Sequence, residues 1–372
     1  MKITQLRQTY GTTARLIEFA GFEMPVWYTS IMEEHLAVRS DCGIFDVSHM
    51  GRFRVKGPES GRLLDSLVPT SIASQPEGRS IYTLLLNTEG GILDDLIIMK
   101  LGDDDYLVVV NAINRERDLA QVDSSHGRMD VEVADETSSS AMIAVQGPRS
   151  GEALQPLTET SLSELRRFRC AEGVISGHPA AISRTGYTGE DGFEIILHDA
   201  SIDDPESALD VWASLLKTAR PCGLGARDSL RIEAGYPLYG NEINERTDPF
   251  EADLAWVVSK EKKGYVGYDS IARLGERPPP VVRRGIVLRE KIPRSGFPVL
   301  AADSSKVGTV TSGTFSPILR RGIALALIDS TRAGLQNQVR VSVRDAEVAG
   351  EIVKPPFYDE KLFGWKRQVN GK

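Results

Sequence analysis

Short strand-like segments that recur along the chain constrain the fold most strongly. In these segments apolar residues dominate or alternate with polar ones, and Gly, Pro, Asn and Asp residues lie between them. The first such group covers residues 51–57, 81–87, 92–101 and 105–112, and a second group covers residues 140–198. Residues 81–101 predict a hairpin, because Gly90 and Gly91 occupy its turn. The pattern predicts sheets with helices and argues against a helical bundle.

Two helices are predicted beside these strands. One follows residue 30, where apolar residues recur among acidic and polar ones. The other covers residues 205–219, where Leu209, Trp212, Leu215 and Leu216 share one face. A chain of 372 residues is too long for one core, because single cores stop growing at about 250 to 300 residues. We therefore expect more than one domain.

A stiff spacer at Arg277-Pro278-Pro279-Pro280 marks the predicted domain boundary. Short strands with turn signals between them follow it, which predicts an antiparallel sandwich or barrel over residues 277–372.

Composition and charge argue against several classes of protein. With 44 basic and 52 acidic residues, the net charge of −8 offers no general attraction to nucleic acid or to an anionic membrane. No apolar stretch approaches the roughly 20 residues that span a bilayer, and Arg7 and Arg15 interrupt any signal-like segment at the start. We expect a cytoplasmic protein without a nucleic-acid or membrane partner.

Cysteine and histidine spacing argues against a metal centre. The three cysteines, Cys42, Cys170 and Cys222, are widely separated, and we expect each to be a small buried side chain. The histidines show no HxH or HExxH spacing. The sequence therefore predicts no metal cofactor.

Adjacent carboxylates inside an apolar strand form the first candidate constellation. Asp94 and Asp95 follow Gly90-Gly91 and precede an apolar run, where an unpaired buried charge would cost several kcal/mol. Strand alternation sends the two side chains to opposite faces, so at most one of them joins a given pocket. The alternative is a carboxylate at the start of a hairpin that accepts hydrogen bonds from backbone amides.

A glycine-rich loop at residues 184–194 is the second constellation. Its glycines permit close approach of a flat ligand to Tyr187 and to a carboxylate. Glu194 is more informative than Glu190, because Glu194 lies inside a strand, where a carboxylate must face solvent or be matched to donors. The alternative interpretation is a surface turn.

The third constellation is CGLGARDSLRIEAG at residues 222–235. It is not a dinucleotide-binding fingerprint, because Asp228 replaces the third glycine and no strand precedes the motif. We therefore predict no nucleotide cofactor. Arg227, beside the glycine turn, is the candidate for a ligand contact. Asp228, Arg231 and Glu233 are expected to form ion pairs on a helix surface.

Together these motifs resemble the T-protein (aminomethyltransferase) family of the glycine cleavage system. The likeness covers nearly the whole chain, in the order AGFEMPVWY (20–28), FDVSHMG (45–51), GGILDDLI (90–97), SRTGYTGEDGFE (183–194), CGLGARDSLRIEAG (222–235) and TSGTFSPILRRGIALALI (311–328). The resemblance implies an α+β fold, a three-domain cloverleaf around a central channel. Two interleaved folate-binding subdomains would occupy residues 1–276, roughly 1–50 with 140–276 and 51–139, and a C-terminal antiparallel β-barrel would follow.

The resemblance also implies roles for individual residues. The catalytic aspartate of the family falls at Asp95. Its folate-binding residues fall at Tyr82, Tyr187, Glu194 and Arg227, with Asn111 and Met50 as channel lining. A further aromatic ligand of some family members is expected near the C-terminus. A count from Pro356-Phe357 reaches Leu362 at that place, so the role is assigned neither to Tyr358 nor to Phe363. For His49 we prefer a structural, hydrogen-bonded side chain.

The reaction implied is transfer of a methylene group from an aminomethyl-lipoyl H-protein to tetrahydrofolate, with release of ammonia. Tetrahydrofolate is then a co-substrate, and the lipoylated H-protein is a transient partner. Either of two basic groups suits an acidic carrier: an arginine group (Arg166, Arg167, Arg169) or a lysine group (Lys260, Lys262, Lys263).

Two other functions are weighed against this one. A demethylase could use the same folate pocket for another one-carbon donor, because fold alone does not determine function. The likeness to the T-protein family extends beyond the pocket residues, which argues against a demethylase. A non-catalytic assembly factor of the iron–sulfur type is the second alternative. The KGC-type motif of such proteins is absent from the sequence, and Asp95 and Glu194 are both present.

Overall fold

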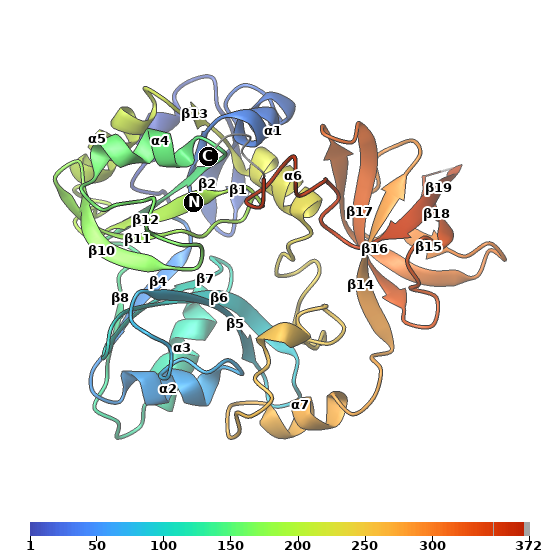
Figure 1. The fold of residues 1–372 in the computed structure, drawn as a ribbon, viewed down its shortest axis with the longest axis horizontal. Helices are drawn as coiled ribbons and strands as arrows, with labels where there is room; N and C mark the ends of the chain where they lie inside the picture. Colours follow the sequence, from blue (N-terminus) through green and yellow to red (C-terminus); the bar gives the residue numbers. More distant parts are fainter. Residues whose placement is uncertain (345, 368–372) are drawn as a thin grey trace. The chain divides into compact units, whose positions relative to one another are not determined.

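The computed structural model describes residues 1–344 and 346–367. Contacts within the chain divide it into two compact units. The first unit comprises Met1–Leu85 and Asp95–Arg227, and the second comprises Leu86–Asp94 and Asp228–Lys372. Both units are built from sheets, and helices accompany the sheets of the first unit (Figure 1).

A six-stranded sheet in the order β10-β11-β12-β9-β3-β13 forms one part of the first unit. Its strands are β3 (Gly43–Asp46), β9 (Ala141–Gln146), β10 (Cys170–Ile175), β11 (His178–Ser183), β12 (Gly192–Leu197) and β13 (Arg220–Pro221). Helices α4 (Ser150–Leu154) and α5 (Glu206–Leu215), with the 3₁₀ turn η2 (Gln155–Leu157), accompany it. Val211 and Trp212 of α5 are buried in one cluster with Ile143 of β9, so apolar burial holds this helix to the sheet.

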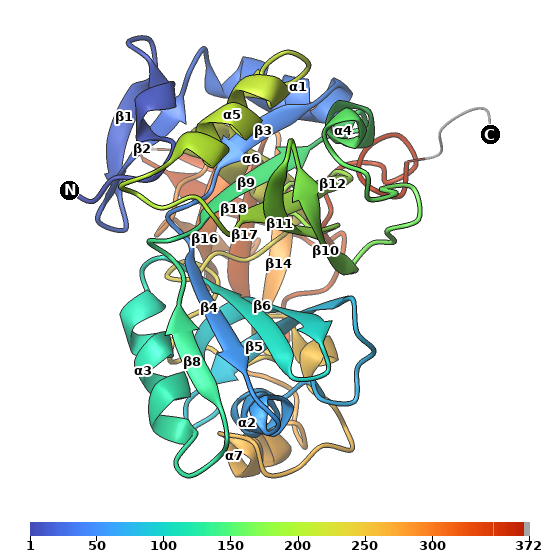
Figure 2. The same ribbon diagram turned by 90° about the vertical axis from the view of Figure 1, so that its left-hand side faces the viewer.

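A five-stranded sheet in the order β5-β6-β7-β4-β8 forms the other part. Its strands are β4 (Gly51–Lys56), β5 (Arg79–Leu86), β6 (Ile92–Gly102), β7 (Asp105–Val110) and β8 (Glu132–Asp135). Helices α2 (Ser60–Leu67) and α3 (Arg115–Ser125) lie side by side against this sheet (Figure 2). The chain passes from β3 of the first sheet to β4 of the second through the short turn 47–50.

The remaining elements of the first unit flank these sheets. They are the 3₁₀ turn η1 (Arg7–Tyr10), the hairpin β1 (Arg15–Phe19) and β2 (Phe22–Trp27), and helix α1 (Ile31–Ser40). Ser30 caps α1 by accepting a hydrogen bond from the Glu33 amide at 3.2 Å, which explains why this helix begins there.

The second unit contains a closed barrel in the order β14-β17-β16-β15-β18-β19. Its strands are β14 (Val281–Leu288), β15 (Pro298–Leu300), β16 (Lys306–Ser316), β17 (Arg321–Asp329), β18 (Gln338–Val343) and β19 (Ala346–Val353). All strand pairs of the barrel are antiparallel. The 3₁₀ turn η3 (Ala255–Val257) and helix α7 (Tyr268–Leu274) precede it, and helix α6 (Leu224–Ala234) begins in the first unit and ends in the second.

The structure confirms the predicted fold class and the C-terminal antiparallel barrel. Strands β5 and β6 are neighbours joined through a turn in which Gly90 has φ 89°, as the hairpin prediction requires. Helix α5 is shorter than the predicted 205–219, because the chain after Leu215 forms turns instead of a further helical segment. The division of the chain at residue 277, and of residues 1–276 into two subdomains, stays a prediction.

Candidate functional site

Asp95 lies at the centre of a hydrogen-bonded group on the five-stranded sheet. Tyr82 of β5 donates its hydroxyl to Oδ2 of Asp95 at 3.0 Å, and Asn111, which follows β7, donates its side-chain amide to Oδ1 at 2.8 Å. The same amide lies 3.2 Å from the Asp95 carbonyl oxygen. Three neighbouring strands thus bring together three of the residues that the sequence singles out, and two donors fix the orientation of the carboxylate.

Asp94 and Asp95 differ in burial as strand alternation predicts. Asp94 is fully buried, whereas Asp95 is partly exposed, and the neighbouring residues of β6 alternate in the same way. A partly exposed carboxylate held by two donors remains available to a bound molecule. Of the two aspartates, Asp95 is therefore the candidate for chemistry.

Glu194 is the second carboxylate of the candidate site. It lies on β12, is 7% exposed, and accepts a hydrogen bond from the Thr185 hydroxyl at 2.5 Å. The Thr185 hydroxyl also lies 2.9 Å from that of Ser183 on β11, and the Ser183 hydroxyl lies 2.8 Å from that of Ser80 on β5. This chain of hydroxyl groups joins the two sheets of the first unit.

The hydroxyl chain ends next to the Asp95 group. Ser80 and Tyr82 are two residues apart on β5, so their side chains point to the same face of the sheet. Tyr82 contacts Asp95, and Ser80 continues through Ser183 and Thr185 to Glu194. The two carboxylates therefore belong to one connected region of the first unit.

Arg227 and Tyr187 form a stacked pair. The guanidinium carbon of Arg227 lies 4.7 Å from the centroid of the Tyr187 ring. Burial lowers the pKa of Arg227 below its usual value, and the negative charge of Glu194 opposes that shift. Nη1 of Arg227 is buried and has no hydrogen-bond partner in the part of the chain that the structure describes. A buried N–H without a partner is a group that a bound ligand can satisfy.

The glycine turn before α6 sets the position of Arg227. A side chain at Gly223 would bring its Cβ within 2.4 Å of the Val26 backbone, so only glycine fits. The Glu34 carboxylate accepts hydrogen bonds from the amides of Gly223 at 2.8 Å and Tyr28 at 2.6 Å. Burial raises the pKa of Glu34, and these backbone donors counteract the rise. Sequence reasoning missed Glu34, although its place in the first turn of a predicted helix was visible.

The other charges of the glycine-rich loop have structural partners. Glu190 forms a buried ion pair with Arg39 at 3.2 Å, and Asp191 pairs with Arg184 through two hydrogen bonds. Because Arg39 already pairs with the charge of Glu190, Glu190 is a weaker candidate for a ligand contact than Glu194.

Met50 and His49 lie in the turn between β3 and β4. Met50 is partly exposed, and its carbonyl oxygen accepts a hydrogen bond from Arg52 at 2.6 Å. His49 is 2% exposed, and its Nδ1 is buried without a hydrogen-bond partner among the described residues. The prediction of a hydrogen-bonded structural histidine is wrong for this atom. The sequence analysis also missed Arg52, which is fully buried. Its place two residues after Met50 on a predicted strand was the available signal, because such residues share one face of a strand.

The charged residues after Arg227 agree with the prediction only in part. Asp228 is exposed and forms the expected ion pair on the helix, whereas Arg231 and Glu233 are buried. Arg231 is 1% exposed and pairs with Asp228 at 2.8 Å and with the buried Glu242 at 2.7 Å. Glu233 is also fully buried and accepts a hydrogen bond from Ser316. Arg231 and Glu233 bind other parts of the second unit instead of lying on a helix surface, because the helix face that carries them packs inside that unit.

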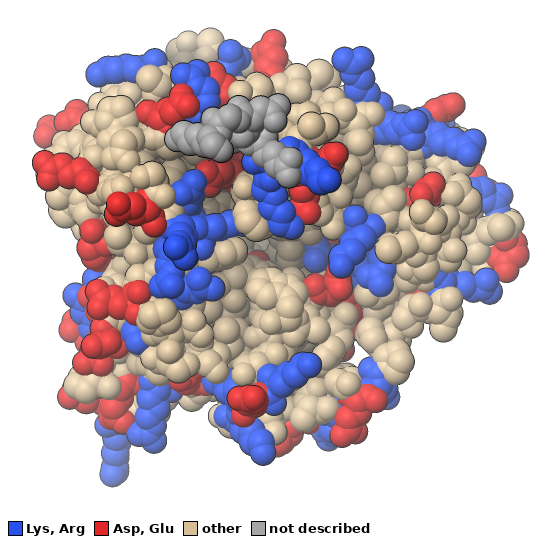
Figure 3. Space-filling model, viewed as in Figure 1, with Lys and Arg blue, Asp and Glu red and all other residues tan. Residues whose placement is uncertain are grey.

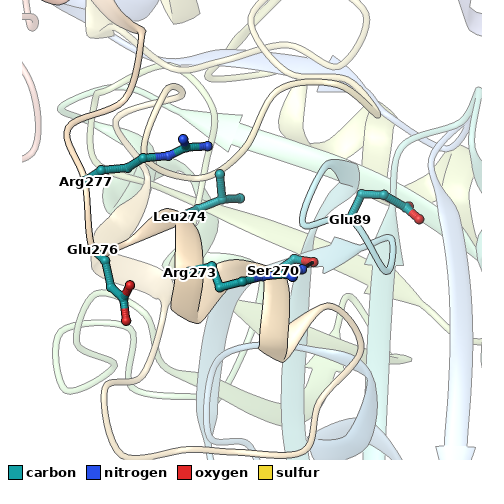
Figure 4. Close-up of a pocket in the computed structure, with 6 residues that line it drawn as sticks. All are labelled: Glu89, Ser270, Arg273, Leu274, Glu276 and Arg277. Atoms are coloured by element: carbon teal, nitrogen blue, oxygen red, sulfur yellow. Dashed lines mark hydrogen bonds between the residues drawn. The ribbon is translucent and has the colours of Figure 1, made fainter.

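A hollow of the second unit is lined by none of the predicted site residues (Figure 4). Its lining residues come from the β5–β6 turn and from α7 and the segment after it: Glu89, Ser270, Arg273, Leu274, Glu276 and Arg277. All seven predicted site residues, by contrast, belong to the first unit. The hollow therefore contributes nothing to the candidate site.

The two basic groups predicted for a carrier lie in different units. In the arginine group, Arg166 is exposed, and Arg169 forms an isolated antiparallel β-bridge with Arg79. The lysine group contains the exposed Lys260 and Lys263 of the second unit. On the face drawn in Figure 3, Lys and Arg side chains gather where the two sheets of the first unit meet.

Two kinds of feature are absent from the part of the chain that the structure describes. In residues 1–344 and 346–367, no group of three or more His, Cys, Asp and Glu side chains is arranged to hold a metal ion. Over the same residues, every helix is too short or too polar to cross a membrane.

The three cysteines are buried as expected, and burial raises the pKa of Cys42 to about 12 and that of Cys170 to about 11.

Comparisons with known proteins agree with this geometry. Residues 6–262 match the GCVT N-terminal domain family, and residues 282–359 match the glycine cleavage T-protein C-terminal barrel domain family. An aminomethyltransferase of Thermotoga petrophila is 42% identical over 370 residues, which cover 96% of this chain and 98% of that protein. An aminomethyltransferase of Thermus thermophilus is 43% identical over 359 residues, covering 96% and 99%. The crystal structure of glycine cleavage system aminomethyltransferase T from Bartonella henselae superimposes with a TM-score of 0.89 at 31% identity and covers 96% of this chain and 98% of that one. The chain therefore belongs to the glycine cleavage T-protein family of aminomethyltransferases.

Proposed function

We propose that Glu194, Arg227 and Tyr187 bind tetrahydrofolate and that Asp95 assists the transfer of a methylene group to it from an aminomethylated, lipoylated H-protein. Membership of the family implies the use of tetrahydrofolate and a partner within the glycine cleavage system. The products are 5,10-methylenetetrahydrofolate, ammonia and the dihydrolipoyl carrier. Tetrahydrofolate supplies two nucleophilic nitrogens, N5 and N10, and the protein supplies their orientation.

The residues present fit a reduced pterin. A pterin edge offers adjacent N–H donors, which suit the buried carboxylate of Glu194. The unpartnered Nη1 of Arg227 offers a donor for an acceptor of the same ring. Tyr187 offers an aromatic surface beside Arg227, and we propose Tyr82 as a second ring contact. Met50 and Asn111 are proposed as lining of the same channel.

Asp95 acts through charge and position in this proposal. Its two oxygens are already oriented by Tyr82 and Asn111, so little reorganisation is needed when positive charge develops on a folate nitrogen nearby. Orientation of reacting groups can supply several kcal/mol of a barrier, and no covalent bond to the protein is required. We therefore propose that Asp95 orients N10 or stabilises positive charge in its vicinity.

The carrier is proposed to approach a basic surface. The arginine group is the better candidate, because Arg79 adds a further cation beside Arg169, whereas Glu261 interrupts the lysine group. Surface cations steer an acidic partner during encounter. We also propose a cytoplasmic location.

The observation that carries the proposal is the carboxylate of Asp95, which two donors fix. Two residues before its donor Tyr82, Ser80 begins a chain of hydroxyl groups that ends at Glu194. The test is release of ammonia from aminomethylated lipoyl H-protein, with 5,10-methylenetetrahydrofolate followed in the same tube. Equal amounts of both products, formed only when tetrahydrofolate is present, are expected. Binding of folate without either product would mean that the pocket serves another one-carbon donor.

A further inference from the structure

His49 is a buried polar side chain for which the proposed reaction has so far no use. Its ring meets the rings of Phe19 and Phe22 edge-on, with centroids 5.6 Å and 6.4 Å away. It is 2% exposed, and Nδ1 has no hydrogen-bond partner among the described residues. A buried polar atom left unpaired destabilises the folded protein, so an apolar residue would suit this aromatic environment better for stability alone.

The backbone on both sides of His49 is fixed. Nη1 of Arg52 donates hydrogen bonds to the carbonyl oxygens of Ser48 at 3.0 Å and Met50 at 2.6 Å. The Ser48 amide donates to the Asp46 carboxylate at 2.8 Å. Arg52 is fully buried, and its other nitrogens bond to residues 137 and 140. The missing partner of His49 is therefore not a sign of a loose turn.

His49 stays uncharged because of its surroundings. Burial lowers its pKa to about 3, and the positive charges of Arg227 and Arg52 contribute to the shift. A neutral imidazole has one N–H donor and one nitrogen acceptor. Near neutral pH His49 can thus form hydrogen bonds, but it does not supply a proton as an imidazolium ion.

Arg227 provides the second, independent observation. Its Nη1 is also buried without a partner among the described residues, and its charge acts on His49. Arg227 stacks on Tyr187 and is influenced by Glu194. Gly51, two residues after His49, pairs with Val110 beside Asn111, so the turn that carries His49 lies next to the Asp95 group. Two buried polar atoms without a partner among the described residues, one in this turn and one on Arg227, indicate a ligand that pairs with both.

We propose that His49 is a ligand-binding residue, whose Nδ1 forms a hydrogen bond to the polar edge of bound tetrahydrofolate beside the Arg227 guanidinium. The inference rests on the proposed function. The alternating N–H and carbonyl groups of a reduced pterin offer partners both to a neutral imidazole and to a guanidinium. His49 therefore adds affinity and orientation for the co-substrate, at the expense of stability in the unliganded protein.

The test compares stability with affinity in His49→Leu, which replaces the imidazole by an apolar side chain. We expect the Tm of the unliganded protein to stay equal or rise, while the Kd for tetrahydrofolate, measured by anaerobic titration calorimetry, rises about tenfold or more. A structural histidine would give the opposite pair of results, a lower Tm with unchanged Kd, and that outcome would overturn the inference.

One control variant and two alternative substitutions of His49 complete the test. Ser60→Ala is the matched control, because the Ser60 hydroxyl is also buried without a partner among the described residues but lies on α2, which carries no proposed site residue. It should keep or raise Tm and leave the folate Kd unchanged. If His49→Leu does not fold, His49→Asn and His49→Gln decide, since the Asn amide reaches the place of Nδ1 and the Gln amide that of Nε2. Tighter folate binding by the Asn variant is expected, and equal or reversed affinities would contradict the inference.

The wild-type protein separates this inference from the proposed function. If wild type does not bind tetrahydrofolate, the proposed function is wrong and the inference with it. If wild type binds and His49→Leu binds equally well, the inference alone is wrong.

Discussion

The hydroxyl of Tyr82 donates a hydrogen bond to Oδ2 of Asp95 at 3.0 Å, while the Asn111 amide occupies Oδ1 at 2.8 Å. Both oxygens of the proposed catalytic carboxylate are thereby oriented before any substrate arrives. Such preorganisation is the main way in which a protein stabilises charge in a transition state.

Tyr82→Phe tests this orientation. The variant keeps the aromatic ring for folate but removes the donor to Asp95. We expect kcat to fall about tenfold with little change in folate Kd, because only the position of the carboxylate is loosened. Stopped-flow product formation and equilibrium titration measure the two quantities. Combined with Asp95→Asn, the loss should be smaller than the product of the two single losses. If the loss of kcat in the double variant equals the product of the two single losses, Tyr82 acts independently of Asp95.

Glu194→Gln tests the proposed pterin contact. An amide offers only one acceptor oxygen and removes the charge that supports Arg227, so the Kd for tetrahydrofolate should rise by roughly 10²-fold. Glu190→Gln is the matched control from the same loop. It weakens the buried pair with Arg39 and should lower Tm while leaving folate Kd unchanged. The reverse pattern in the two variants would assign the pocket to Glu190.

The pH dependence of stability reports on His49. Its pKa is about 3 in the folded protein and near 6.5 when exposed, so the unfolded chain binds more protons between these values. Above pH 6.5 the titration of His49 therefore does not change the free energy of unfolding. As pH falls from 6.5 towards 3, it lowers the free energy of unfolding progressively. In denaturant titrations at several pH values, His49→Leu should lose less stability on the acid side than wild type. Parallel curves for the two proteins would show that His49 is accessible to protons when folded.

Carrier docking is tested by charge reversal. Arg166→Glu with Arg169→Glu should raise KM for the aminomethylated H-protein roughly three- to tenfold and flatten its dependence on salt, because surface steering is screened by ions. Folate Kd should not change. The same reversal at Lys260 and Lys263 serves as the comparison. A larger effect there would place the docking surface on the lysine group.

Much of this architecture follows from local sequence patterns. The burial of Asp94 and the exposure of Asp95 follow from strand alternation, and the turn with Gly90 follows from its glycines. The resemblance to the T-protein family is confirmed by the comparisons. The roles of Asp95, Tyr82, Tyr187, Glu194, Arg227, Asn111 and Met50 remain predictions.

What could not be predicted depends on contacts between distant segments. Ser80 and Ser183 are far apart in the chain and unremarkable in composition, yet their hydroxyl groups join two sheets. Arg231 and Glu233 looked like surface charges because periodicity alone does not show that their partners Glu242 and Ser316 are buried with them. The sequence also does not show that Nδ1 of His49 is without a hydrogen-bond partner among the described residues, because that depends on the side chains packed around it.

The most direct test of the account is a comparison of Asp95→Asn with Asp94→Asn in single-turnover kinetics and in tetrahydrofolate binding. The account predicts that Asp95→Asn lowers the rate on the order of 10²-fold while folate Kd changes little, because the carboxylate acts on developing charge. Asp94→Asn, fully buried on the opposite face, should mainly lower Tm. Equal losses of rate and affinity in Asp95→Asn, or a larger loss of rate in Asp94→Asn, would contradict the role proposed for Asp95.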